Sequence, residues 1–163
     1  MARARAGERG QVAVYAVLLF PLLMLVLALV LAVGTLEGMR TRLRAQVDMA
    51  ALTATQALDV ASLAAGGEPR LMPDAAAQLA REYLARNLSA SSDLLAASPS
   101  EIAAGAAVSV RNEDGIDPIT GAPNTAPTVS IEIQAPVRVP LLGLTGLGPV
   151  VTLTIAGSAA ART

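Results

Sequence analysis

The 163-residue chain contains no cysteine, histidine, lysine or tryptophan, and it has only one phenylalanine and two tyrosines. Without cysteine it can form neither a disulfide nor a thiolate nucleophile. Without histidine it lacks the commonest general base and the commonest transition-metal ligand. The absence of lysine excludes a Ser/Thr-x-x-Lys nucleophile motif and a lysine-bearing phosphate loop. Three aromatic residues offer little surface for stacking bases or sugars. We therefore expect neither an enzyme nor a bound cofactor.

Basic charge is also missing from most of the chain. All twelve basic residues are arginines, and half of them lie at or before Arg44. From Ala45 onward six arginines stand against eleven acidic residues, which gives this part a net charge of −5. A surface of that sign repels phosphates, so we expect no binding to nucleic acid or to anionic lipid.

What the chain does have is one long uncharged run, residues 12–33, which follows a short tail containing three arginines. As a helix these 22 residues reach roughly 33 Å, enough to cross a hydrocarbon core of about 30 Å. Eight leucines, six valines and one phenylalanine favour insertion by about 5 to 9 kcal/mol. The run predicts a single transmembrane helix rather than the buried helix of a soluble protein.

A cleaved secretory signal is the main alternative, because Arg3, Arg5 and Arg9 resemble a basic n-region. The apolar run is longer than an ordinary signal core, however, and Ala32-Val33-Gly34 is a poor cleavage site. Arginines also flank the far end of the run. The short tail still favours a cytoplasmic N-terminus, since long C-terminal regions translocate largely regardless of charge. We expect a single-pass protein of the inner (cytoplasmic) membrane, oriented N-in and C-out.

Beyond the membrane the helix is predicted to continue as far as residue 65, where Gly66-Gly67 breaks the pattern. Apolar or small residues recur there at alternating steps of four and three, which lines one face of a helix. This stripe consists of Leu43, Val47, Ala50, Ala54, Ala57 and Ala61. It can pack on the protein's own domain or on neighbours in an assembly, and the sequence leaves both open.

Two further features bear on helix packing. Gly34-x-x-x-Gly38, at the predicted membrane exit, would let two helices approach backbone to backbone, although this motif is common by chance in such sequences. Pro21 removes one backbone donor inside the predicted span and crowds the carbonyl of Val17. It therefore predicts a kink or a locally melted stretch.

The N-terminal residues carry a family resemblance. The heptapeptide Arg9-Gly10-Gln11-Val12-Ala13-Val14-Tyr15 leads into an apolar helix with a proline eleven positions from Gln11, counting that residue as the first. This resembles the start of TadE/TadG-like proteins, the minor-pilin-like components of tight-adherence (Flp-type) pilus systems. The Ala-rich segment 43–52 is similar to the one that follows the anchor in TadG-like members. The resemblance is specific mainly over residues 8–58.

The resemblance implies a membrane-anchored structural or assembly component of a pilus, which acts through helix packing and protein–protein contacts. Its implied partners are other pilin-like or pilus-assembly proteins and, at the junction between Gly10 and Gln11, a prepilin peptidase. Processed members usually carry glutamate where this chain has Tyr15. TadG-like members commonly lack it, so the chain is nearer that branch, and we expect it to stay in the membrane or to enter a surface pilus in low copy. The alternative is an unrelated single-pass envelope protein with an extracytoplasmic ligand-binding domain.

The rest of the sequence predicts a small α+β domain. A helix is expected over residues 74–88, because Pro73 suits a first helical turn and an apolar face recurs as far as Leu88. Residues 89–101 read as a connection with at most a short helical turn. Alternating valine, isoleucine and leucine predict strands over residues 106–110, 129–133 and 151–155. A long N-terminal helix with an antiparallel sheet of about three strands is a pilin-like plan.

The predicted organisation therefore has four parts. These are a basic cytoplasmic tail or leader (1–11), a transmembrane helix (12–33), an extended Ala-rich helix (34–65) and an extracytoplasmic α+β domain (66–163).

Two loops of the domain carry candidate sites. Residues 112–117 concentrate oxygen ligands and suggest a calcium site, but their spacing does not match an EF-hand, so a solvated turn between strands is the simpler interpretation. The second loop, residues 140–149, is too apolar for a plain surface connection. It either folds back on the sheet or forms a partner-binding patch. Its leucines are Leu141, Leu142, Leu144 and Leu147.

Overall fold

The computed structural model describes the backbone of residues 5–143, 146 and 148–161, with the side chains of residue 15 and of residues from 17 onward within those ranges. The chain divides into two compact units. The first comprises Met1–Glu37 and Val139–Pro149, and the second comprises Gly38–Arg138 and Val150–Thr163.

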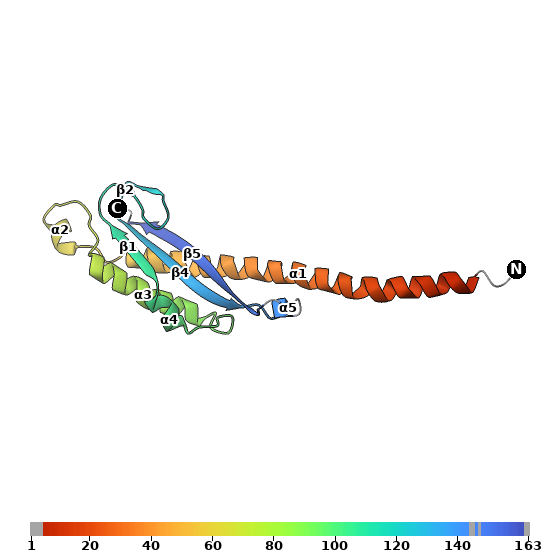
Figure 1. Ribbon diagram of the computed structural model, residues 1–163. Helices are drawn as coiled ribbons and strands as arrows, with labels where there is room; N and C mark the ends of the chain where they lie inside the picture. Colours follow the sequence, from red (N-terminus) through yellow and green to blue (C-terminus); the bar gives the residue numbers. More distant parts are fainter. Residues whose placement is uncertain (1–4, 144–145, 147, 162–163) are drawn as a thin grey trace. The chain divides into compact units, whose positions relative to one another are not determined.

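The helices are α1 (Arg5–Ala54), α2 (Val60–Ala64), α3 (Pro73–Ser89), α4 (Pro99–Ala104) and α5 (Pro140–Gly143) (Figure 1). The strands are β1 (Ala107–Arg111), β2 (Gly115–Ile116), β3 (Pro123–Asn124), β4 (Thr128–Arg138) and β5 (Val150–Ala160). A long apolar helix followed by a small antiparallel sheet confirms the expected α+β class.

Helix α1 runs for 50 residues without a break. It stays helical through Pro21. The proline removes one backbone N–H donor and crowds the carbonyl of Val17, so the helix loses a backbone hydrogen bond there without ending. The alternative of a melted stretch at this proline is therefore wrong.

The C-terminal end of α1 lies earlier than the sequence predicts. The helix ends at Ala54, so the expectation of one helix as far as residue 65 is also wrong. The chain turns because Leu58 forms a β-bridge with Leu71. Two backbone hydrogen bonds flank that bridge, from Asp59 N–H to the Arg70 carbonyl and from Met72 N–H to the Ala57 carbonyl, both 2.8 Å long. A contact between distant segments thus overrides a locally favourable helical pattern.

Helix α3 follows the predicted pattern closely. Pro73 occupies its first turn, where a missing N–H costs nothing, and Asp74 lies near the positive end of the helix dipole. Its apolar face is fully buried and comprises Ala76, Ala80, Leu84 and Leu88.

Helix α4 overlaps the end of segment 89–101, for which the sequence predicts a connection with at most a short helical turn. Ser98 and Glu101 form a reciprocal capping box: the Ser98 side chain accepts from the Glu101 N–H, and the Glu101 carboxylate accepts from the Ser98 N–H. These bonds satisfy free donors of a short helix that would be marginal alone. The sequence Ser-Pro-Ser-Glu over residues 98–101 is typical of such a capping box.

The main sheet has three antiparallel strands in the order β1-β4-β5, with β4 in the centre. The three predicted strand positions are correct, but β4 and β5 are each eleven residues long, about twice the predicted length. Pro136 is tolerated within β4 because β1 pairs only as far as Glu132, so no neighbouring strand of the sheet needs a donor at the proline.

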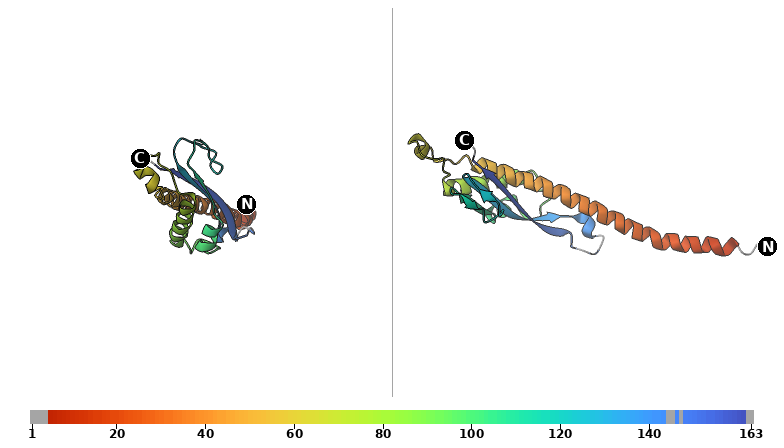
Figure 2. Two further views of the ribbon diagram at one scale, coloured as in Figure 1. Left: turned by 90° about the vertical axis from the view of Figure 1, so that its left-hand side faces the viewer. Right: turned by 90° about the horizontal axis from the view of Figure 1, so that it is seen from above.

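One face of this sheet forms the core of the second unit. Alternate residues of β4 are at most 1 % exposed, and they comprise Val129, Ile131, Ile133, Ala135 and Val137. The C-terminal part of α1 and the whole of α3 lie on this face, whereas the loop that carries β2 lies on the other (Figure 2). The sheet is thus covered by helices on one side, as the alternation of apolar and polar residues predicts.

Candidate functional site

The N-terminal part of α1 presents an apolar surface to the outside. From Val17 to Val33 its large apolar side chains are between 43 % and 73 % exposed. By length and composition the helix is apolar enough to cross a membrane. Such a surface is suited to lipid, because large contiguous apolar patches are rare on proteins surrounded by water.

The junction between Gly10 and Gln11 lies inside α1, where the backbone is already helical. The side chains of these two residues lie outside the described part of the structure. Tyr15, which the family resemblance would align with the glutamate of processed members, is 70 % exposed. Cleavage at this junction remains a prediction.

The two glycines of Gly34-x-x-x-Gly38 are exposed on α1. A Cβ built at either position would meet nothing within 4 Å. None of the described residues therefore packs against this small-residue face, which leaves it open for a neighbouring helix, as the motif suggests.

Four of the six residues of the predicted stripe lie on α1 and are buried within the chain, whereas Ala57 is half-buried and Ala61 is exposed beyond the end of that helix. Leu43 is 2 % exposed, whereas Val47, Ala50 and Ala54 are fully buried. On β5, a Cβ at Gly157 would meet the Asp48 carboxylate and, at 3.0 Å, Val47 Cγ1. This close approach of helix to strand requires glycine. Of the two alternatives left open for these four residues, packing on the protein's own domain is the one observed.

Polar contacts fix α1 against the end of α3. The Gln46 amide donates to the Ser91 hydroxyl over 2.9 Å, and the Asn87 amide donates to the Gln46 carbonyl over 3.2 Å. Ser91 is only 1 % exposed, so its bond to Gln46 satisfies a buried hydroxyl. These two hydrogen bonds fix the position of α1 along the end of α3.

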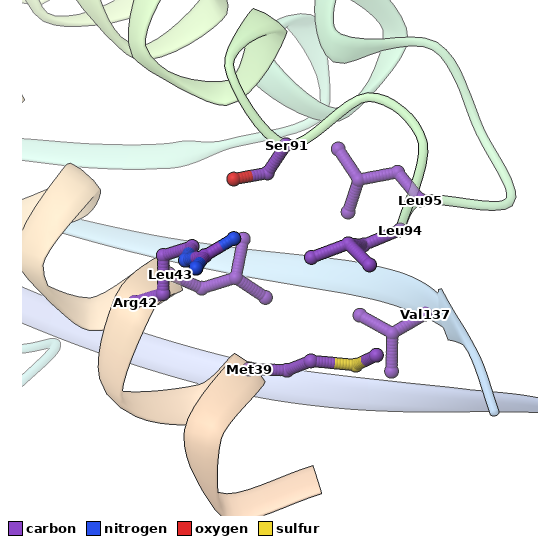
Figure 3. Close-up of a pocket in the computed structure, with 7 residues that line it drawn as sticks. All are labelled: Met39, Arg42, Leu43, Ser91, Leu94, Leu95 and Val137. Carbon is purple, nitrogen blue, oxygen red and sulfur yellow. The ribbon is translucent and has the colours of Figure 1, made fainter. Parts of the chain in front are cut away.

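Next to these contacts lies a small cavity, which Figure 3 shows together with its lining. Its volume of about 10 Å³ is close to the minimum for a single water molecule. It is lined by Met39, Arg42, Leu43, Ser91, Leu94, Leu95 and Val137. A space of this size is a packing defect in an apolar core and too small for a ligand.

The apolar loop forms the short helix α5 and belongs to the same compact unit as the N-terminal part of α1, not to the unit that contains the sheet. Leu142 is 8 % exposed and Leu141 is half-buried, whereas Leu144 and Leu147 lie outside the described residues. That division does not test whether the loop folds back on the sheet, which remains a prediction. A partner-binding role remains a prediction.

The acidic loop is more ordered than a solvated turn. Asn112 forms two hydrogen bonds with the backbone of Leu71, accepting from its N–H over 2.7 Å and donating to its carbonyl over 2.9 Å. It thereby anchors the segment that ends α1. Further along, Gly115 pairs with Asn124 in the two-stranded β2–β3 ribbon, which no pattern in the sequence predicts.

Asp117 is the buried centre of this loop, at 1 % exposed. Its Oδ1 accepts from the Thr120 N–H at 2.6 Å, the Ile119 N–H at 2.8 Å and the Thr120 hydroxyl at 3.0 Å. Its Oδ2 accepts from the Ser130 hydroxyl at 2.5 Å. These bonds tie the loop to the polar face of β4.

The same environment shifts the acidity of this carboxyl group. Burial raises the pKa of Asp117, but the hydrogen bonds from Ser130, from the Thr120 and Ile119 backbone and from the Thr120 hydroxyl together outweigh it, so the pKa lies below its usual value. The signal in the sequence was Asp-Pro-x-Thr, which is typical of a turn closed by an aspartate side chain.

The calcium hypothesis finds no support in this geometry. The Asn112 and Asp117 oxygens that it needs already accept hydrogen bonds from the protein. Among the described residues, no three acidic side chains gather closely enough to hold a metal ion. The loop is better described as a structural cover on the polar face of the sheet.

Comparison with protein-family models, with curated proteins and with solved structures gives no match for this chain.

Proposed function

We propose that this chain is a membrane-anchored, non-catalytic component of a Tad/Flp-type pilus, minor-pilin-like and nearer the TadG-like branch. The observation that carries the proposal is the double use of α1. Its N-terminal part exposes large apolar side chains from Val17 to Val33, and the same helix then buries the stripe from Leu43 to Ala54 on a small antiparallel sheet. Anchor and domain core are thus one element, as in pilin-like proteins.

The proposed orientation places the N-terminus in the cytoplasm and the second unit outside the inner membrane. A short arginine-containing tail at one end and a net charge of −5 beyond Ala45 favour this arrangement. The partners would be the lipid bilayer, other pilin-like or pilus-assembly proteins and a prepilin peptidase, without nucleic acid or cofactor.

The contacts available for assembly follow from what the chain already uses. The stripe from Leu43 to Ala54 is buried internally, so it is not free to pack on neighbouring subunits. The exposed face at Gly34 and Gly38 is free of neighbours in the described structure. Helix–helix packing in the assembly would therefore occur within the membrane and at its exit.

The intact mass of the protein from native membranes tests the proposal, measured with the prepilin peptidase present and with it deleted. Loss of residues 1–10 only when the peptidase is present would support a processed, pilin-like component despite Tyr15. Loss of that segment in both strains would point to another protease and would contradict the assignment.

A full-length chain in both strains would remove processing from the proposal. The pilus assignment then depends on a second measurement, the yield of surface pili in cells that lack this protein. Unchanged piliation would overturn the assignment and favour the unrelated envelope protein.

A further inference from the structure

The strand β5 lies at the edge of the three-stranded sheet. It pairs with β4 along its whole length, from Val150 opposite Arg138 to Ala160 opposite Thr128, and β4 is its only neighbour in the sheet. One side of an eleven-residue strand is therefore without a partner strand among the described residues.

The register defines which backbone groups face outward. Just beyond the ladder, the Ala161 N–H donates to the Pro127 carbonyl over 2.8 Å, so this is a hydrogen-bonded pair. Such pairs alternate along an antiparallel ladder, so the odd-numbered residues of β5 exchange bonds with β4. The bond from Ala96 N–H to the Pro136 carbonyl agrees, since it shows that even-numbered β4 groups point away from β5.

The even-numbered residues of β5 consequently direct their N–H and carbonyl groups to the free edge. No hydrogen bond to another segment of the described chain uses these backbone groups. The six residues are Val150, Thr152, Thr154, Ala156, Ser158 and Ala160.

Proteins usually protect such an edge with charge, proline, a bulge or short length. Strand β5 has no charged residue and no proline, and its register with β4 is unbroken over eleven residues. The opposite edge strand, β1, has only five residues and ends at Arg111. The contrast marks β5 as the unprotected edge of the sheet.

We propose that the free edge of β5 binds an extended strand of a different protein by β-strand addition. The added strand would pair with the six outward-facing residues. On the helix-covered side it would place apolar side chains beside Val151 and Leu153, which are only half-buried because no strand lies beyond them. On the other side it would meet the exposed hydroxyls of Thr152, Thr154 and Ser158. An uncharged segment of alternating apolar and small polar residues fits this chemistry.

A second copy of this chain fits less well. Two β5 strands could pair antiparallel about a two-fold axis at Ile155. All six outward-facing residues of each strand would then lie opposite outward-facing residues of the other. That axis would run the outer parts of the two α1 helices in opposite directions, because α1 and β5 lie roughly alongside each other in the second unit (Figure 1). The ends that lead to the membrane helices would then leave the dimer on opposite sides. The inference depends on the register of β5 and, for the choice of a different protein over a second copy, on the proposed membrane anchor, but it does not depend on the assignment to a pilus.

The first test is residue-resolved amide hydrogen exchange, by NMR, of the full-length purified protein in detergent micelles. We expect the even-numbered amides from Thr152 to Ser158 to exchange close to the unprotected rate, while the odd-numbered amides between them stay protected. Protection of both sets in the isolated chain would mean that the edge is already closed, and would overturn the proposal.

The second test is photo-crosslinking in the cells that produce the protein, with p-benzoylphenylalanine at the exposed Ser158. Thr154→Pro removes one outward N–H and obstructs an added strand, whereas the matched control Thr154→Val keeps the backbone intact. We expect a discrete adduct with another protein, located on an uncharged segment, that is lost in the proline variant and retained in the valine variant.

Three outcomes of the crosslinking experiment would overturn the proposal. These are no adduct at Ser158, an adduct with a second copy through β5, and an adduct that persists unchanged in the proline variant. Protected odd-numbered amides in purified Thr154→Pro would show that this variant folds, so that the loss of its adduct reports the edge alone.

Discussion

Protonation of Asp117 should weaken the domain in acid, and Asp117→Asn should remove that dependence. The variant keeps a carbonyl oxygen for the three donors at Oδ1, but the Ser130 hydroxyl loses a charged acceptor. A hydrogen bond to a charged group contributes about 1.5–3 kcal/mol and a neutral one about 0.5–1.5 kcal/mol. We therefore expect Asp117→Asn to lower the free energy of unfolding by about 1–2 kcal/mol at pH 7.

The sign of the pH dependence follows from the lowered pKa of Asp117 in the folded protein. As pH falls below the usual value of 3.8, the unfolded chain takes up the proton first. The stabilisation is therefore complete above that pH and is lost as pH falls through the folded-state pKa. The wild type should lose stability there, and the difference from Asp117→Asn should shrink toward zero.

Urea unfolding of the full-length protein in detergent micelles measures this difference, at pH 7 and at steps from about pH 5 to about pH 2. The fluorescence of half-buried Tyr83 reports on the domain, since the chain has no tryptophan. Glu101, whose pKa is also lowered by its hydrogen bonds to Ser98, is common to both proteins and cancels. The control Asp114→Asn removes an exposed charge from the same loop. Parallel stability curves for wild type and Asp117→Asn would refute the reasoning.

Three further changes test the packing of the chain by the same unfolding assay or by crosslinking. Val47→Ala should cost about 2–3 kcal/mol because it leaves a cavity between helix and sheet, whereas exposed Met49→Ala should change stability by less than about 0.5 kcal/mol; equal effects would contradict the packing. Asn112→Ala should lower the free energy of unfolding by about 2 kcal/mol, because it leaves the backbone N–H and carbonyl of Leu71 without their hydrogen-bond partner. An unchanged free energy of unfolding would refute this anchoring role. Leucine at both Gly34 and Gly38 should leave domain stability unchanged, since a Cβ at either position meets no described residue from outside its own helix turn within 4 Å. The same change should reduce crosslinking between helices in native membranes, and unreduced crosslinking would exclude this face from assembly.

Some features of the fold could be predicted because their signals are local. An apolar run of membrane length specifies a helix whatever surrounds it. The face of α3 from Ala76 to Leu88 follows from helical periodicity, and the three strand positions follow from alternation. The length of β5 exceeds the prediction because its second half consists of small residues from Ala156 to Ala160, which carry a weak alternation signal.

Features that depend on partners distant in the sequence could not be predicted. The end of α1 depends on the bridge between Leu58 and Leu71, and the ordered acidic loop depends on the bond from Ser130 to Asp117. In each case a local pattern allowed two conformations, and a contact across the fold selected one of them.

The sequence by itself therefore determined the long apolar helix, the α+β class and the inward-facing residues of α3 and β4, because these follow from the spacing of apolar residues along a short stretch of chain. Only the tertiary structure decided the strand order, and with it that β5 rather than β4 lies at the edge. Strand order depends on which distant segments exchange backbone hydrogen bonds, and the backbone of every residue carries the same donor and acceptor.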